Sequence, residues 1–98
     1  MKTLRLASVG LFLTGTLMAA TPFSTSSTGY DWLGASKDYK MEYCTLMATA
    51  NQKIAPGITK ELIFGSLEEF YRTSDASLLN QKIVQMVALT VTVYVHSR

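Results

Sequence analysis

Few side chains in this sequence could carry chemistry. Cys44 is the only cysteine and His96 the only histidine, so a thiol nucleophile would have a single candidate base. Cys44 lies in an apolar stretch, whereas His96 lies two residues before the end of the chain. One cysteine and one histidine also fall short of the usual ligand set of a zinc site. Two interpretations of Cys44 stay open: a small buried hydrophobe, or one half of an intermolecular disulfide.

The serine and carboxylate side chains form no catalytic pattern either. Ser66 lies in the segment FGSLE, which lacks the glycines of a nucleophile elbow. Glu68 and Glu69 are neighbours, so on a helix they diverge by about 100° and do not face each other as a glycosidase pair does. The sequence also has no glycine-rich phosphate loop. We therefore expect no catalytic, cofactor-binding or metal site, and a protein that is not an enzyme.

The first 20 residues have the pattern of a secretory signal peptide. Lys2 and Arg5 supply positive charge, residues 6–17 are uncharged and mostly apolar, and Ala20 offers a small residue for cleavage. The pattern predicts a bacterial protein that is periplasmic or secreted. The apolar run is shorter than the roughly 20 residues of a spanning helix, so no stable membrane span is expected after cleavage. The alternative is an uncleaved segment that tethers the chain to the membrane.

Cleavage after Ala20 would leave a chain of 78 of the 98 residues that has no net charge. Of the nine Lys and Arg residues, the signal segment holds Lys2 and Arg5, so seven remain against seven Asp and Glu residues. A neutral chain argues against nucleic acid as a partner, because phosphate binding needs a basic face. A domain of this size with one cysteine cannot use an internal disulfide to stabilise its core. Stability would then depend on helix packing, on a protein partner or on a homodimer.

Apolar periodicity predicts an all-α fold. Residues 21–35 are rich in Ser, Thr, Pro and Gly at their start and are expected to be a flexible leader. Apolar residues then recur at steps of three and four in the segments 36–54, 59–71 and 74–95. We expect these segments to form a three-helix domain over residues 36–98.

The ends of these helices carry their own signals. Ser36 and Thr59 have side chains that can accept a hydrogen bond from the first helical turn. Pro56 and Gly57 are expected to stop the first helix. The secondary structure of residues 87–95 is less clear, because Val alternates with Thr and Tyr there, as in a strand. A helix is favoured there, since the apolar period continues unbroken from the preceding residues.

A short aromatic segment, YDWLG, precedes the first expected helix. Tyr30, Trp32 and Leu33 are hard to place in a three-helix core. They either pack back over that core or form an exposed edge for a protein partner.

From Cys44 onward the chain resembles a loose group of small exported helical proteins of bacteria that have no assigned function. The matching features are Cys44, Gly57 followed by Ile58 and Thr59, Glu61, and the run from residue 83 to 94. The resemblance covers about half of the chain and implies no activity and no site residue. In that group a second cysteine often follows the final tyrosine. In this sequence no cysteine follows Tyr94, so one open interpretation is that the chain is a shortened member of the group with an incomplete core.

The pattern as a whole favours a small non-catalytic binding or interaction protein. The expectation depends on the lack of a chemical signature and on a core too small to be stable without help. The alternative is an inhibitor or immunity-type protein that neutralises an enzyme of the cell envelope.

Overall fold

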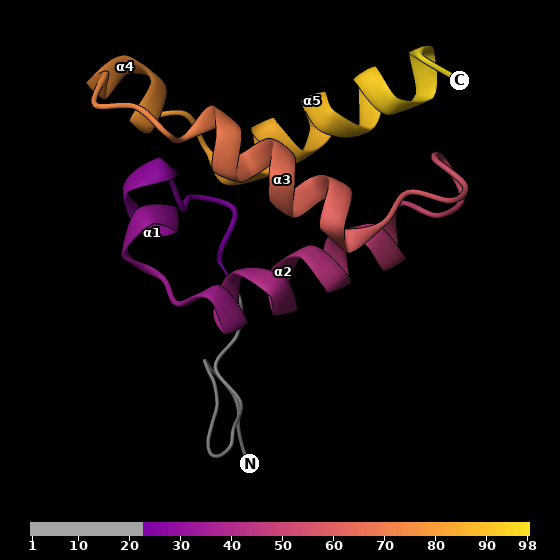
Figure 1. The fold of residues 1–98 in the computed structure, drawn as a ribbon, viewed down its shortest axis with the longest axis horizontal. Coiled ribbons are helices and arrows are strands. Elements are labelled where there is room, and N and C mark those ends of the chain that lie inside the picture. The colour runs from indigo at the N-terminus through magenta and orange to yellow at the C-terminus, as the bar shows by residue number, and fades with distance from the viewer. Residues whose placement is uncertain (1–22) are drawn as a thin grey trace.

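The computed structural model describes residues 23–98, and these residues form an all-α domain (Figure 1). The predicted signal peptide, residues 1–20, and the first two residues of the predicted leader lie outside the described residues. Within 23–98 there is no strand, and a single antiparallel bridge joins Thr28 to Lys82. The domain has five helices: α1 (Gly29–Gly34), α2 (Lys37–Ala50), α3 (Lys60–Phe70), α4 (Ala76–Leu79) and α5 (Ile83–His96).

Both predicted N-caps are confirmed. The Ser36 hydroxyl accepts a hydrogen bond from the backbone N–H of Tyr39 at 3.2 Å. The Thr59 hydroxyl accepts one from Leu62 N–H, also at 3.2 Å. These bonds satisfy N–H groups that the first turn of a helix leaves without a partner.

The first long helix ends earlier than expected, at Ala50 rather than residue 54. Gln52 organises the turn that replaces its last residues. Its side-chain nitrogen donates to the carbonyls of Ala48 and Ile58 at 3.1 and 2.8 Å, and its oxygen accepts from Gly57 N–H at 3.1 Å. Gly57 has a φ of 88°, a conformation that favours glycine. The turn is therefore an ordered, hydrogen-bonded connection that holds the start of α3 against the end of α2.

The third expected helix, residues 74–95, is divided into α4 and α5. Between α4 and α5, backbone groups that would otherwise continue the helix form hydrogen bonds with distant parts of the chain. The carbonyl of Gln81 accepts from the Tyr71 hydroxyl at 2.8 Å, and Ile83 N–H donates to the Ser27 carbonyl at 2.9 Å. The doubtful stretch 87–95 lies within α5, so the helical prediction is confirmed there.

The flexible leader predicted for residues 21–35 is wrong over its described part, residues 23–35. The Phe23 ring packs on the ring of Trp32, and the Ser27 carbonyl accepts from Ile83 N–H. Residues 29–34 form α1, and the Trp32 side chain is fully buried. The expectation failed because Ser, Thr and Gly dominate the local composition, whereas the apolar area of Trp32 decides the structure through contacts distant in sequence. Tyr30 and Leu33, on the same helix, keep about half of their surface exposed.

The helices pack with α3 between α2 and α5 (Figure 1). The core between them is entirely apolar, since no polar or charged residue among the described ones is buried. Its largest fully buried side chains come from all of the main segments: Trp32, Tyr71, Ile63, Leu67, Ile83 and Cys44. None of the helices within residues 23–98 has the length and apolar character needed to cross a membrane.

Among the described glycines, Gly29 has the least room for a side chain. A Cβ atom added to Gly29 would lie 2.4 Å from the Tyr71 ring and 2.9 Å from the Leu79 carbonyl oxygen. Gly34, at the other end of α1, has no atom within 4 Å of the same added position. Glycine at position 29 thus lets α1 lie directly on Tyr71.

We predict that Gly29→Ala lowers the free energy of unfolding by about 1–3 kcal/mol, because the methyl group overpacks a site with no room. Gly34→Ala is the matched control and is expected to be neutral or slightly stabilising. Urea unfolding followed by circular dichroism measures both. Equal stability of the two variants would show that α1 does not pack on Tyr71 as described.

Candidate functional site

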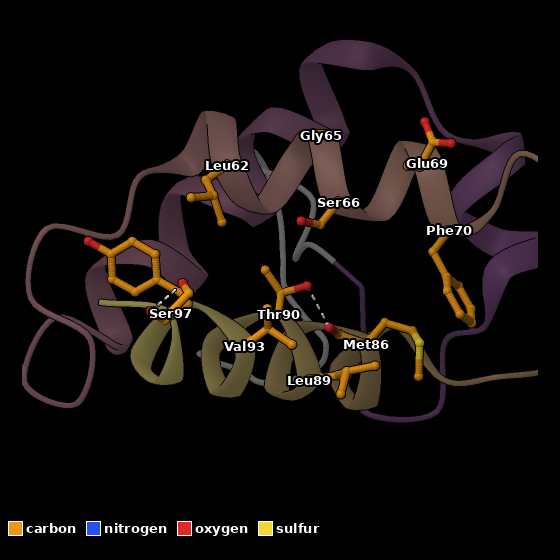
Figure 2. Close-up of a pocket in the computed structure, with 11 residues that line it drawn as sticks. Leu62, Gly65, Ser66, Glu69, Phe70, Met86, Leu89, Thr90, Val93 and Ser97 are labelled. Carbon is orange, nitrogen blue, oxygen red and sulfur yellow. Dashed lines mark hydrogen bonds between the residues drawn. The ribbon is translucent and has the colours of Figure 1, made fainter.

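A groove runs between α3 and α5 on the surface of the domain (Figure 2). It has a volume of about 590 Å³, which is within the range of small binding sites. Leu62, Ser66 and Phe70 extend from α3 toward α5, one helical turn apart (Figure 2). The remaining lining residues are Gly65, Glu69, Met86, Leu89, Thr90, Val93, Tyr94 and Ser97.

Most polar atoms along this groove are already used inside the chain. The Thr90 hydroxyl donates to the Met86 carbonyl at 2.9 Å, and the Ser97 hydroxyl donates to the Tyr94 carbonyl at 3.1 Å. The Glu69 carboxylate is paired with Arg72 at 2.8 Å. With these groups satisfied, the groove offers apolar surface and few directional contacts to a ligand.

The α5 wall of the groove is apolar on the outside as well as on the inside. Ile83, Val87 and Val91 are buried against the core. Leu89 and Val93 are 52% and 58% exposed, although both are large apolar residues. No Asp, Glu, Lys or Arg occurs between Ile83 and His96. A helix that is apolar on more than one face is normally covered on both, so the outer face of α5 lacks a counterpart within the described domain.

Gly65 is the feature of the α3 wall that packing within the chain does not explain. A Cβ atom at this position would have no atom within 4 Å, so no neighbour in the described structure requires a glycine there. Glycine in the middle of a helix costs roughly 1 kcal/mol relative to alanine. The absence of a side chain leaves open space in the groove, where another backbone could approach closely.

One end of the groove is tied to the turn between α2 and α3. The Pro56 carbonyl accepts from the Tyr94 hydroxyl at 3.0 Å and from the Arg98 guanidinium at 2.8 Å. The guanidinium also lies 5.5 Å from the centre of the Tyr94 ring, a cation–π contact. These contacts hold the C-terminal turn of α5 in place, so the groove has two fixed walls.

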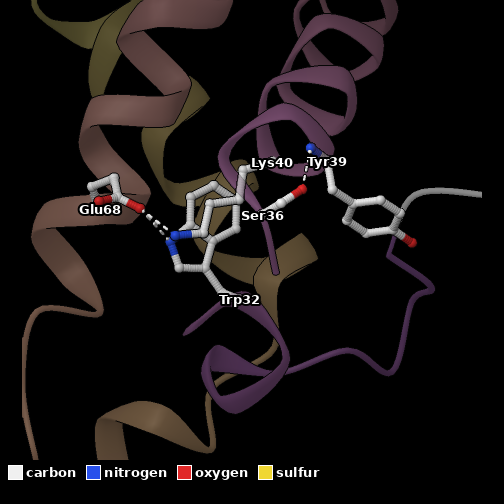
Figure 3. Close-up of polar contacts among 5 residues, drawn as sticks. All are labelled: Trp32, Ser36, Tyr39, Lys40 and Glu68. Atoms are coloured by element: carbon white, nitrogen blue, oxygen red, sulfur yellow. Dashed lines mark hydrogen bonds and ion pairs between the residues drawn. The ribbon is translucent and has the colours of Figure 1, made fainter. Parts of the chain in front are cut away.

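A polar cluster lies between α1, α2 and α3 (Figure 3). One carboxylate oxygen of Glu68 accepts from the Trp32 indole N–H at 3.0 Å and from the Lys40 ammonium at 2.8 Å. Lys40 also lies 5.0 Å from the centre of the Trp32 ring. The Lys40 hydrogen bond is the main reason that the pKa of Glu68 is held below its ordinary value. The cluster satisfies a buried indole, and we interpret it as structural.

Cys44 is fully buried and forms no disulfide. Burial raises the pKa of its thiol to about 12, and the negative charge of Glu68 adds to the effect. A thiol without access to solvent and with a high pKa is a poor nucleophile. The structure therefore favours the buried hydrophobe over the intermolecular disulfide and over catalysis.

The other predicted candidates do not converge on one place. Trp32 is part of the core, whereas Tyr30 and Leu33 lie on the exposed side of α1, away from the α3–α5 groove. His96 is the last residue of α5 and is exposed. Within residues 23–98, no group of three or more His, Cys, Asp and Glu side chains could hold a metal ion.

Sequence reasoning missed the groove itself. Helical periodicity identifies one apolar stripe on a helix, and for the segment 74–95 it predicts that this stripe packs into the core. The available signal was the uncharged run from Ile83 to Val95, which has more apolar residues than one buried face can use. The position of Gly65 opposite that run depends on how α3 and α5 pack, which the sequence pattern does not reveal.

Comparisons of this chain with protein-family models, with curated proteins and with solved structures give no match. The resemblance to small exported bacterial proteins therefore stays a prediction.

The Glu68 cluster makes stability depend on pH. Because the pKa of Glu68 is lower in the folded state than its unfolded value of about 4.3, the ionised carboxylate stabilises the fold above that pH. This contribution disappears as the pH falls through the lowered pKa. We predict that Glu68→Gln lowers the free energy of unfolding by about 1 kcal/mol at pH 7, with a smaller loss at pH 3.

Urea unfolding of the wild type and Glu68→Gln at both pH values measures this difference. Glu69→Gln is the control, because Glu69 and Arg72 form a highly exposed pair, which contributes little. A Glu68→Gln effect that is the same at both pH values would contradict the role given to the ionised carboxylate.

Proposed function

We propose that this protein is an exported, non-catalytic helical binding protein, and that the α3–α5 groove is where it holds a protein partner. The observation that carries the proposal is the exposed apolar wall of α5, with Leu89 and Val93, facing an open space at Gly65. Exposed apolar surface next to a concave site is typical of interaction sites.

The occupant that fits this groove best is an apolar ridge on a helix. A small polar ligand would need several convergent polar groups to orient it, whereas most of the polar groups here are bonded within the chain. A helix lying between α3 and α5 needs no such polar groups from the groove, because its own backbone groups, except those at its ends, are already hydrogen-bonded. Apolar residues at steps of three and four would fill the groove, as in other helix-in-groove complexes.

Export is supported by the sequence alone. Lys2 and Arg5, followed by an apolar run and Ala20, have the order of a signal peptide. An extracytoplasmic location is also compatible with a protein whose single thiol, Cys44, is buried and free.

Cleavage after Ala20 predicts a product that begins at Thr21. Intact-mass spectrometry of the protein made in a bacterial host, with separate analysis of the periplasm, the medium and the membrane, measures this directly. A protein that keeps Lys2 and Arg5 in every fraction would contradict export by cleavage and favour the membrane tether.

We predict that the groove binds the uncharged apolar dye Nile red and that Leu89→Glu abolishes this binding. The dye reports apolar surface by a rise in emission, and a carboxylate at position 89 places a charge on the wall of the groove. Dye titration of the dilute protein measures the effect.

Leu46→Glu is the matched control. Leu46 lies on α2, outside the groove, and is 49% exposed, against 52% for Leu89. Both variants should keep the helical circular dichroism of the wild type. If Leu46→Glu weakens dye binding as much as Leu89→Glu does, the α3–α5 groove is not the binding site.

A further inference from the structure

We propose that the partner held by the α3–α5 groove is a second copy of this chain, and that the two copies form a two-fold dimer through their α5 helices. The proposal rests on the proposed function, because it uses the same groove and the same kind of occupant. It goes further by naming the helix that fills the groove, which is α5 of the other copy.

The distribution of charge is the first argument. A surface that meets its own copy brings like charges close together unless it carries none or pairs them. Between Ile83 and His96 there is no Asp, Glu, Lys or Arg, on the exposed side or on the buried side. Glu69 is the one acidic or basic residue that lines the groove, and its charge is paired with Arg72. A dimer through this face therefore meets little electrostatic opposition, whereas the groove offers a hetero-partner little charge to complement.

The shape of the face is the second argument. Leu89 and Val93 are one turn apart on α5 and form a short exposed ridge along the α5 wall of the groove. In a two-fold arrangement, the ridge of each copy enters the groove of the other, so one contact buries both ridges. The open position at Gly65 lies in the groove, where the incoming helix needs room. Packing of this kind uses a ridge and a groove, as helix pairs generally do.

The small size of the domain is the third argument. The described chain covers 76 residues, from 23 to 98, without a disulfide. A single core of this size supplies limited stability. Dimerisation through α5 would bury the exposed Leu89 and Val93 and give that helix a second covered face.

Sedimentation velocity of the purified protein over a range of concentrations tests the proposal. The wild type is expected to dimerise, and Leu89→Glu should raise the dimer dissociation constant by at least about a hundredfold, because it buries an unpaired charge at the interface. Gly65→Leu should also raise the dimer dissociation constant, because the leucine side chain fills the groove. Its Cβ position is open within one chain, so this variant is expected to stay folded. Leu46→Glu, outside the groove, should dimerise like the wild type.

Nile red titration of the same samples separates this inference from the proposed function. If the groove is the dimer interface, dye bound per chain falls as the protein concentration rises. Suppose that the wild type stays monomeric at all concentrations and binds dye, and that Leu89→Glu loses this dye binding. The dimer proposal would then be overturned, and the groove would remain as a site for another protein. A dimer that survives in both Leu89→Glu and Gly65→Leu would place the interface elsewhere and overturn the inference. A monomer that binds no dye would overturn both.

Discussion

The burial of Trp32 is the constraint on which the rest of the domain depends. Its ring lies within 5.9 Å of Phe64 and 6.5 Å of Tyr71, measured between ring centres, and its indole N–H donates to Glu68. One side chain therefore ties α1 to α3, and the Lys40 ammonium over its ring adds α2. Without a disulfide, a small chain needs a large buried aromatic group of this kind to join segments that are distant in sequence.

Once Trp32 is in place, the position of α5 follows. The segment before α1 lies beside the start of α5, because Ser27 accepts the hydrogen bond of Ile83 and Thr28 forms a bridge with Lys82. At its other end, α5 is held by the contact of Tyr94 with Pro56. With both ends fixed, α5 covers the core with one face and leaves an apolar face beside α3. The groove is thus a consequence of how the core is closed.

Local signals in the sequence predict α2, α3 and α5, but they predict neither α1 nor the contacts between the helices. Ser36 and Thr59 act as the caps that their chemistry indicates, since capping involves residues only three positions apart. The burial of Trp32 in α1 and the break before α5 depend on partners at least ten residues away in the sequence. Periodicity within one segment contains no information about such partners. The groove was unpredictable for the same reason, since it belongs to two helices at once.

Trp32 is the only tryptophan in the chain, so its fluorescence tests the account most directly. Under native conditions, the account predicts blue-shifted emission and protection from quenching by iodide, both lost together when urea unfolds the helices. Emission at the wavelength of a solvated indole, with free access to iodide while the helical circular dichroism is intact, would contradict it. In that case α1 would not belong to the core, and nothing would hold the start of α5 beside it.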